Sequence, residues 1–187
     1  PPLFGSGKLD KRAAEFIGLL VGDGCLMGEQ ETAMLTLEPE ASEMAFGIAQ
    51  GLTSWKAEHA TSGHELHPVH VNHPQQTLRV GTSARVVVDE AKRFAILDKG
   101  SAGKAFTPAV FGLGRDCVAS LLRGLFSADG TVADYGERSQ YVSLGRSSLE
   151  LLEQVQLLLL GFGIKAKLYK NRRAEGTKTT LLPDGKG

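Results

Sequence analysis

The chain has 187 residues, 42% of them hydrophobic and 22% charged, and its 21 basic residues balance its 21 acidic residues at pH 7. This length suits one large domain or two small fused halves. Two cysteines are too few for a disulfide framework and no apolar run is long enough to cross a membrane, so we expect a soluble cytoplasmic protein without membrane partners.

The charge is distributed unevenly along the chain. Residues 1–137 contain 12 of the 21 basic residues and 17 of the 21 acidic residues, which leaves 9 basic and 4 acidic residues for 138–187. The basic surface is therefore expected at the C-terminal end of the chain.

The first part of the chain is predicted to alternate helices with antiparallel strands. Asp10 can cap the first helix, and Ser83 can cap the last helix of this part. The predicted elements are a helix over 10–23, a hairpin over 25–38, a helix over 42–55, two or three strands within 56–82 and a helix over 83–96.

The second part of the chain repeats this order at an offset of 106 residues. Its predicted elements are a helix over 115–129, a hairpin over 131–145, a helix opened by a capping box over 147–160, and basic strands over 164–173 and 178–182. The equivalents of the last strand and closing helix of the first part fall near or beyond residue 187. We therefore expect a first half over 1–97, a linker over 98–114 that begins as a loose loop, and a second, truncated half over 115–187.

The helices that open the two halves share a motif. Each is an apolar run that carries two small residues four positions apart, and each run stops at Asp-Gly. Residues four apart lie on one helix face, so a second helix can approach that face closely. The small residues are Gly18 and Gly22 in the first run, and Gly124 and Ala128 in the second.

The two motifs place Asp23 and Asp129 at helix C-termini. Gly24 and Gly130 can adopt the left-handed conformation that ends a helix, and the macrodipole there opposes a negative charge. If the two helices pack side by side, the carboxylates converge and repel each other, which a divalent cation would relieve. Either Asp-Gly alone could be an ordinary turn. An aspartic-protease pair is disfavoured, because it needs Asp-Ser/Thr-Gly on turns after strands.

The paired motifs resemble those of the LAGLIDADG homing endonucleases in their single-chain, two-motif form, as found in inteins. Residues 103–108 (Gly-Lys-Ala-Phe-Thr-Pro) resemble the block before the second motif, and 148–169 resemble the helix-then-strand block after it. The resemblance extends from about residue 16 to residue 169. It implies an α/β (α+β) fold of two pseudo-symmetric αββαββα halves, with a two-helix seam and DNA-binding antiparallel sheets.

The resemblance also implies a function. The chain would be a site-specific endonuclease that makes a staggered double-strand break in a long DNA target by metal-dependent phosphodiester hydrolysis, as in intein homing. Asp23 and Asp129 would be catalytic and, with the backbone carbonyls of Gly22 and Ala128, would hold Mg²⁺. Lys104 would be the catalytic basic residue near the hydrolytic water, with Lys99 as the fallback and an ordinary loop lysine as the alternative. We expect a monomer embedded in an intein splicing domain.

Basic side chains near the sheets are the predicted DNA contacts, with a solvated surface as the alternative for each. Lys165 and Lys167 alternate with apolar residues, which places both ammonium groups on one face. The set is Arg79, Arg85, Arg138, Arg146, Lys165, Lys167, Lys170, Arg172 and Arg173.

Two observations bear on rival functions. Four of the five histidines recur every third residue between 64 and 73, but prolines interrupt this run, so DNA contact or solvation is favoured over a zinc site. A nucleic-acid binder without catalysis, such as a maturase or transcription regulator, and an inert insert in a host protein remain as alternatives. The retention of both acids and of Lys104 favours the nuclease.

Overall fold

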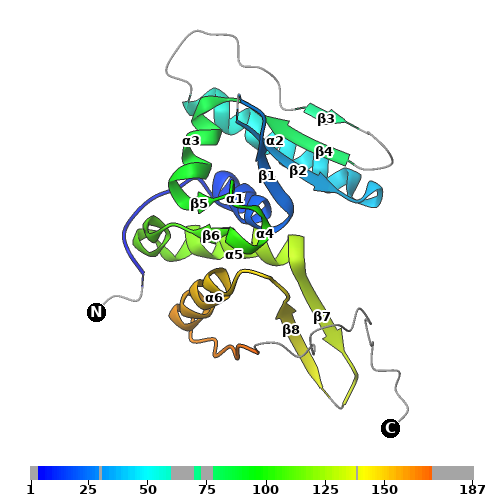
Figure 1. The fold of residues 1–187 in the computed structure, drawn as a ribbon, viewed down its shortest axis with the longest axis vertical. Coiled ribbons are helices and arrows are strands. Elements are labelled where there is room, and N and C mark those ends of the chain that lie inside the picture. The colour runs from blue at the N-terminus through cyan, green and yellow to red at the C-terminus, as the bar shows by residue number, and fades with distance from the viewer. Residues whose placement is uncertain (1–3, 30, 60–69, 73–77, 138, 170–187) are drawn as a thin grey trace.

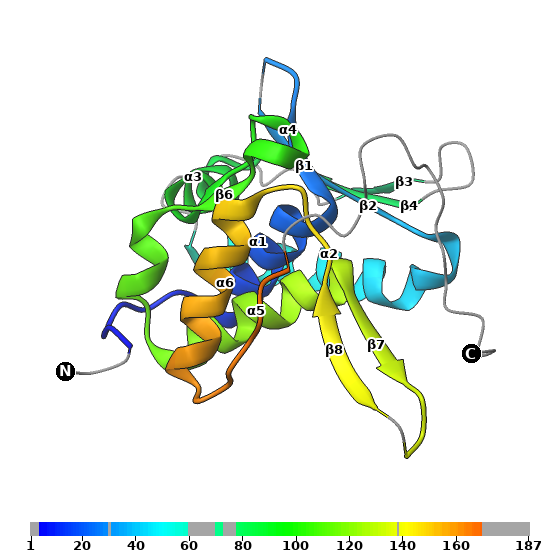
Figure 2. The ribbon, with the colours of Figure 1, turned by 60° about the horizontal axis from the view of Figure 1, so that its bottom comes forward.

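Two helices packed side by side form the centre of the molecule (Figures 1 and 2). The computed structural model describes residues 4–29, 31–59, 70–72, 78–137 and 139–169. The central helices are α1 (Lys11–Asp23) and α5 (Arg115–Asp129). A Cβ on Gly18 would collide with the carbonyl oxygen of Leu121, and one on Gly124 with that of Glu15. The small-residue seam predicted from the sequence is therefore confirmed.

The first half follows the predicted αββαββα order. The α1 helix begins after Asp10, whose carboxylate accepts a hydrogen bond from the backbone N–H of Arg12. The sheet is antiparallel in the order β1-β2-β4-β3, and α2 lies behind it (Figure 1). Its elements are β1 (Gly24–Met27), β2 (Thr32–Leu37), η1 (Pro39–Ala41), α2 (Ser42–His59), β3 (His70–Asn72), β4 (Leu78–Thr82) and α3 (Arg85–Phe94).

The predicted cap of the last helix in this half is wrong. Ala84, not Ser83, is the N-cap residue of α3, and no side chain caps that helix end. The hydroxyl of Thr82 instead accepts the backbone N–H of Ala84. The chain passes directly from β4 into α3, so Thr82, the last residue of the strand, accepts the hydrogen bond from the backbone N–H of Ala84.

The join between the halves contains short regular elements, and the loose loop expected at its start includes one helical turn although residues 98–102 are exposed. It contains β5 (Ala95–Ile96), α4 (Gly100–Gly103), β6 (Ala105–Phe106) and η3 (Pro108–Gly112), and β5 pairs with β6. Phe106, Val110 and Leu113 belong to the hydrophobic core. This packing holds the residues before α5 against α1 and α3.

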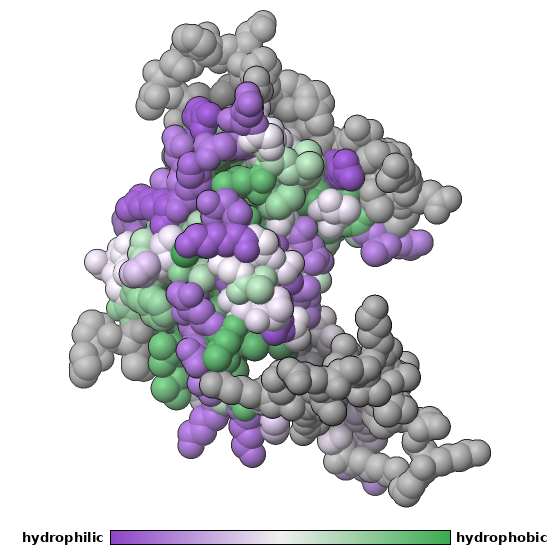
Figure 3. Space-filling model, viewed as in Figure 1, coloured by the Kyte–Doolittle hydropathy of each residue, from purple (hydrophilic) through white to green (hydrophobic). Residues whose placement is uncertain are grey.

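The second half contains the predicted hairpin and helix. They are β7 (Gly130–Asp134), β8 (Gln140–Leu144) and α6 (Leu149–Gly161), and Ser148 caps α6 by accepting the N–H of Leu151. The first sheet lies above the seam helices and the hairpin projects below them, both toward the right of the views (Figures 1 and 2). Hydrophobic side chains reach the surface over α6 (Figure 3), where Leu157 and Leu160 are exposed.

The predicted strand after α6 is wrong for the residues that are described. Residues 164–169 have no strand structure, because the side-chain amide of Gln156 donates to the carbonyl of Ala166 and holds this segment against α6. The remainder of the predicted strands, 170–173 and 178–182, lies outside the described residues. Among the described helices, none has the length and apolar character needed to span a membrane.

Candidate active site at the end of the helix seam

The C-terminal ends of α1 and α5 bring Asp23 and Asp129 together, as the motifs predicted. Neither following glycine is left-handed, however: Gly24 has φ −95° and Gly130 has φ −71°, both in extended backbone. A Cβ on Gly24 would collide with Leu20, because each chain turns directly from the helix into a strand. Glycine is therefore needed here for close approach and not for a positive φ.

The electrostatics of Asp129 reflect this convergence. Burial raises the pKa of the Asp129 carboxyl, the neighbouring Asp23 raises it further, and Arg146 opposes the shift. A Cβ on Gly22 would lie 3.3 Å from the carboxylate of Asp129. The C-terminal end of α1 and the carboxylate of Asp129 at the end of α5 thus lie close together.

Arg146 is the closest cation to this pair. It follows β8, and its guanidinium donates to the backbone carbonyls of Val21, at 2.9 Å, and of Gly22. The same terminal nitrogen forms an ion pair with Asp129, and the Arg146 side chain is only 10% exposed. Arg146 was predicted to contact DNA from a strand, and the structure places it inside the candidate site.

Lys104 is brought to the site as predicted, and its ammonium caps the end of α1. It donates to the carbonyls of Leu20, Gly22 and Gly24 at 3.3, 2.9 and 2.6 Å. The residue is 6% exposed, and burial, with a further effect of Arg146, lowers the pKa of its amine. A cation at a helix C-terminus is stabilised by the macrodipole. Lys99, the fallback, is exposed on the surface.

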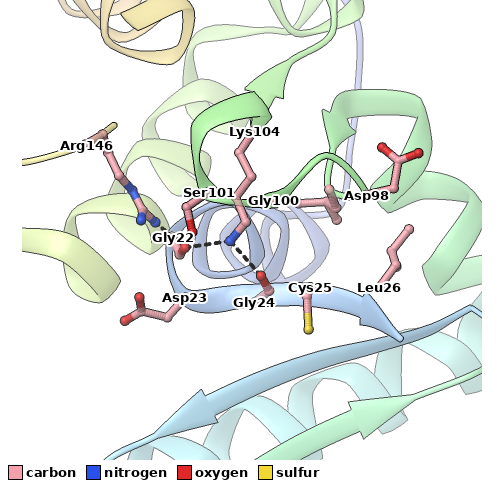
Figure 4. Close-up of a pocket in the computed structure, with 11 residues that line it drawn as sticks. Gly22, Asp23, Gly24, Cys25, Leu26, Asp98, Gly100, Ser101, Lys104 and Arg146 are labelled. Carbon is pink, nitrogen blue, oxygen red and sulfur yellow. Dashed lines mark hydrogen bonds between the residues drawn. The ribbon is translucent and has the colours of Figure 1, made fainter. Parts of the chain in front are cut away.

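A cleft of about 400 Å³ opens beside these groups (Figure 4). Figure 4 shows Lys104 and Arg146 converging on Gly22, while the Asp23 side chain points away from Lys104. Sequence reasoning missed Cys25, Asp98 and Ser101, which also line the cleft. Cys25 could have been found, because it follows the first Asp-Gly directly, whereas nothing in the sequence marks the two residues of the join.

The site has hard oxygen ligands for a divalent cation. The described residues hold no group of three or more His, Cys, Asp and Glu side chains suited to a metal. Two carboxylates and a helix-end carbonyl nevertheless suit Mg²⁺ or Mn²⁺, which commonly bind one or two carboxylates and complete their shell with water and phosphate. Burial and the neighbouring Asp23 raise the pKa of Asp129, and a bound cation would offset both effects. The residues present therefore fit such an ion.

The other predicted DNA contacts are spread over both halves. Arg79 lies half-buried on β4, and Arg85 begins α3, where it pairs with Glu31 at 3.1 Å. Lys165 and Lys167 are exposed and alternate with half-buried residues, but they do not lie on a strand, so their placement on one sheet face stays a prediction. Arg138, Lys170, Arg172, Arg173 and the side chains of the histidines lie outside the described residues.

Comparison with known proteins identifies relatives of both parts of the chain. Residues 116–182 match the family model described as a LAGLIDADG-like domain. Ribonucleoside-diphosphate reductase NrdEB subunit alpha of Bacillus subtilis (strain 168) is 28% identical over 182 residues, which cover 93% of this chain and 16% of that protein. Glutamine–fructose-6-phosphate aminotransferase of Methanocaldococcus jannaschii is 37% identical over 89 residues, 45% of this chain and 8% of that protein. The chain thus spans about a sixth or less of these relatives.

Solved structures match the fold over most of the chain. The homing endonuclease I-DmoI, in a complex with its target DNA in the presence of manganese, aligns with a TM-score of 0.55 and 15% identity, covering 83% of this chain and 77% of that one. A structure of mesophilic I-DmoI variants aligns with a TM-score of 0.51 over 83% of this chain and 79% of that one. Residues 116–182 are therefore similar to the LAGLIDADG-like domain, and the chain has the fold of the LAGLIDADG homing endonucleases.

Proposed function

We propose that the chain is a site-specific DNA endonuclease that makes a staggered double-strand break by metal-dependent phosphodiester hydrolysis. The observation that carries this proposal is the meeting of Asp23 and Asp129 at the ends of two helices, beside the carbonyl of Gly22. A fold used only for binding would not need two acids at this position. The matched I-DmoI structure contains target DNA and was obtained with manganese, which supports the same chemistry here.

In this proposal, Asp23, Asp129 and the backbone carbonyls of Gly22 and Ala128 hold Mg²⁺. The ion, when bound, supplies an activated water and neutralises charge on the scissile phosphate. Lys104 acts as a positioning residue, because its three hydrogen bonds fix the carbonyl end of α1 from which Gly22 and Asp23 emerge. Water activation by Lys104 itself would require its ammonium to leave these carbonyls.

Double-stranded DNA would lie against the sheet face opposite α2 and against the β7–β8 hairpin. On β2, buried Ala33, Leu35 and Leu37 face the core, and the alternate residues face outward. Arg79 on β4 lies opposite Thr36 in the strand register and so shares this outward face. Phosphate contacts from Lys165 and Lys167 would position the DNA, and groove contacts from the sheet would read the sequence.

We further propose that the chain is the nuclease part of an intein, embedded in a splicing domain. Its curated relatives are a reductase, an aminotransferase and the large subunit of a viral reductase, and the shared segment is 16%, 8% and 7% of their lengths. A short segment shared by enzymes of different activity is expected of an insert carried by its hosts. A monomer suffices for this function, because one chain supplies both acids.

The proposed cleavage is tested by selecting cut sequences from a randomised DNA library in Mg²⁺, with the wild type and with Asp23→Asn and Asp129→Asn. We expect the wild type to enrich one long site, and both variants to lose cleavage while still binding that site in Ca²⁺. Asp116→Asn is the matched control, since this exposed acid lies at the opposite end of α5 and pairs with Lys11. It should cut like the wild type.

One observation favours a second candidate, a DNA-binding protein that does not cut. The guanidinium of Arg146 pairs with Asp129 and donates to the carbonyl of Gly22, so the chain itself supplies a cation to these oxygens. In that case the library would yield a bound sequence without any cut product. Equal cleavage by the wild type and both Asn variants would instead remove the acids from the mechanism.

A further inference from the structure

We propose that Arg146 is a displaceable counter-ion: its guanidinium occupies prospective metal ligands in the metal-free protein, and a divalent cation must expel it to bind. This inference rests on the metal site of the proposed function. It adds that a side chain of the same protein, Arg146, competes with the metal for its ligands.

The contacts of Arg146 coincide with the ligands assigned to the metal. Its terminal nitrogen donates to the Gly22 carbonyl at the end of α1 and pairs with the Asp129 carboxylate at the end of α5. These are two of the four groups expected to hold Mg²⁺. The guanidinium therefore bridges the same two helix ends that a metal would bridge.

A metal and the guanidinium cannot share these oxygens without cost. Both are cations, and at the separation of neighbouring ligands their repulsion is large in a site shielded from water. The Arg146 side chain is only 10% exposed, so solvent screens this repulsion weakly. One of the two cations must leave.

Arg146 is the cation that can leave, and Lys104 is the one that stays. Lys104 is 6% exposed and donates to three carbonyls. Arg146 lies in the irregular segment between β8 and α6, and its Nε has no hydrogen-bond partner among the described residues. Its side chain can therefore rotate outward without breaking a helix or a strand.

The expelled guanidinium would have a partner in DNA. Arginine binds phosphate oxygens through two parallel hydrogen bonds. A phosphate beside the seam would thus stabilise the expelled state, and DNA should tighten metal binding while metal tightens DNA binding by the same factor. The free protein would hold metal weakly until DNA arrives.

The test measures Mn²⁺ binding without DNA, from the loss of the free-ion signal in electron paramagnetic resonance. The proteins are the wild type, Arg146→Met, Arg146→Lys and Arg123→Met. Arg123 pairs with Glu15 across the same two helices, but away from the acids, so it is the matched control. We expect Arg146→Met to bind Mn²⁺ at least about tenfold more tightly than the wild type, because charge-assisted hydrogen bonds no longer compete. Arg123→Met should match the wild type.

Arg146→Lys keeps the competition measurable if Arg146→Met does not fold, which circular dichroism would reveal. Lysine retains the charge but cannot bridge both helix ends with a planar fork, so its Mn²⁺ affinity should lie between those of the wild type and Arg146→Met. Equal or weaker Mn²⁺ binding by both Arg146 variants would overturn the competition and leave the nuclease proposal intact. No Mn²⁺ binding by any protein would overturn both the competition and the metal assignment.

Discussion

Lys104 ties the join to the first half of the molecule through a single ammonium group. It enters from the join and donates to three carbonyls between Leu20 and Gly24, 80 to 84 residues earlier in the chain. Burial lowers the pKa of this amine, so the protein bears a desolvation cost to keep the cation there. The hydrogen bonds offset that cost by giving carbonyls at the end of α1 a charged donor.

Replacing Lys104 by Met should lower the free energy of unfolding by about 2 kcal/mol or more, because three buried carbonyls lose their charged donor. Urea denaturation of the metal-free protein would measure this. Lys99→Met, five residues earlier and exposed, should change stability by less than about 0.5 kcal/mol. Equal losses in the two variants would mean that Lys104 does not support α1.

Asp10 makes the start of α1 sensitive to acid. A side-chain hydrogen bond from Arg12 lowers the pKa of the Asp10 carboxyl, which also caps the helix. An acid whose pKa is lower in the folded state stabilises the fold above its unfolded pKa, near 3.8 here, and this stabilisation disappears as the pH falls through the folded pKa. Asparagine caps a helix equally well.

Asp10→Asn should therefore lower the free energy of unfolding by about 0.5–1 kcal/mol at pH 7, the contribution of a half-buried ion pair that solvent still screens. The difference from the wild type should shrink as the pH falls below about 4 and the carboxyl becomes protonated. Denaturation curves from pH 7 downward would show it. A difference that is independent of pH would point to the cap and not to the charge.

The close packing of the seam helices depends on glycines at their contact positions. Gly18 and Gly124 remove side chains where the backbones of α1 and α5 touch, and Leu121 and Leu125 fill the space on either side with fully buried groups. This close approach aligns the two helix ends. The distance between Asp23 and Asp129 is thus set by glycines one turn or more away from the acids.

Gly18→Ala should destabilise the protein by about 3 kcal/mol, because its Cβ would meet backbone atoms of α5 that cannot rotate away. Gly47 lies on the exposed side of α2, where an added Cβ would meet no atom beyond its own helix within 4 Å. Gly47→Ala should therefore stabilise the protein by about 0.5–1 kcal/mol through helix propensity alone. Thermal unfolding of both variants provides the comparison. If Gly18→Ala is as stable as the wild type, the helices do not pack this closely.

At the scale of the whole molecule, basic side chains differ in whether an acid pairs with them. Arg12, Arg85, Lys92 and Arg123 are all paired with acids, whereas Lys165 and Lys167 are exposed near the end of the described residues. A protein of zero net charge can still bind a polyanion through such a local surface.

Replacing Lys165 and Lys167 with Ala should reduce the slope of log affinity for DNA against log salt by about 2, one unit for each lost phosphate contact. The site enriched by the library selection would serve as the probe, in Ca²⁺ to prevent cutting. Lys92→Ala is the control, because Lys92 is held by Glu31 at 2.7 Å. An unchanged slope in the double variant would mean that both lysines face solvent in the complex.

The order of elements and the meeting of two acids were predictable from the sequence alone. Small residues four apart mark one helix face, and an Asp-Gly at the same place in two apolar runs predicts that two carboxylates meet where the helices end. These signals are local, because the side-chain periodicity of a helix or strand records which face is buried. The αββαββα order of the first half follows from the same information.

Tertiary structure alone decided what surrounds those acids. Arg146 reaches carbonyls 124 and 125 residues away, and Lys104 reaches carbonyls 80 to 84 residues away, with that of Gly22 shared by both. The extended backbone at Gly24 and Gly130 depends equally on how each strand leaves its helix. The sequence pattern of a basic residue after a hairpin is the same whether its side chain faces DNA or a helix end. Only the packing of β8 and the join against the seam determines which oxygens lie within reach of each cation.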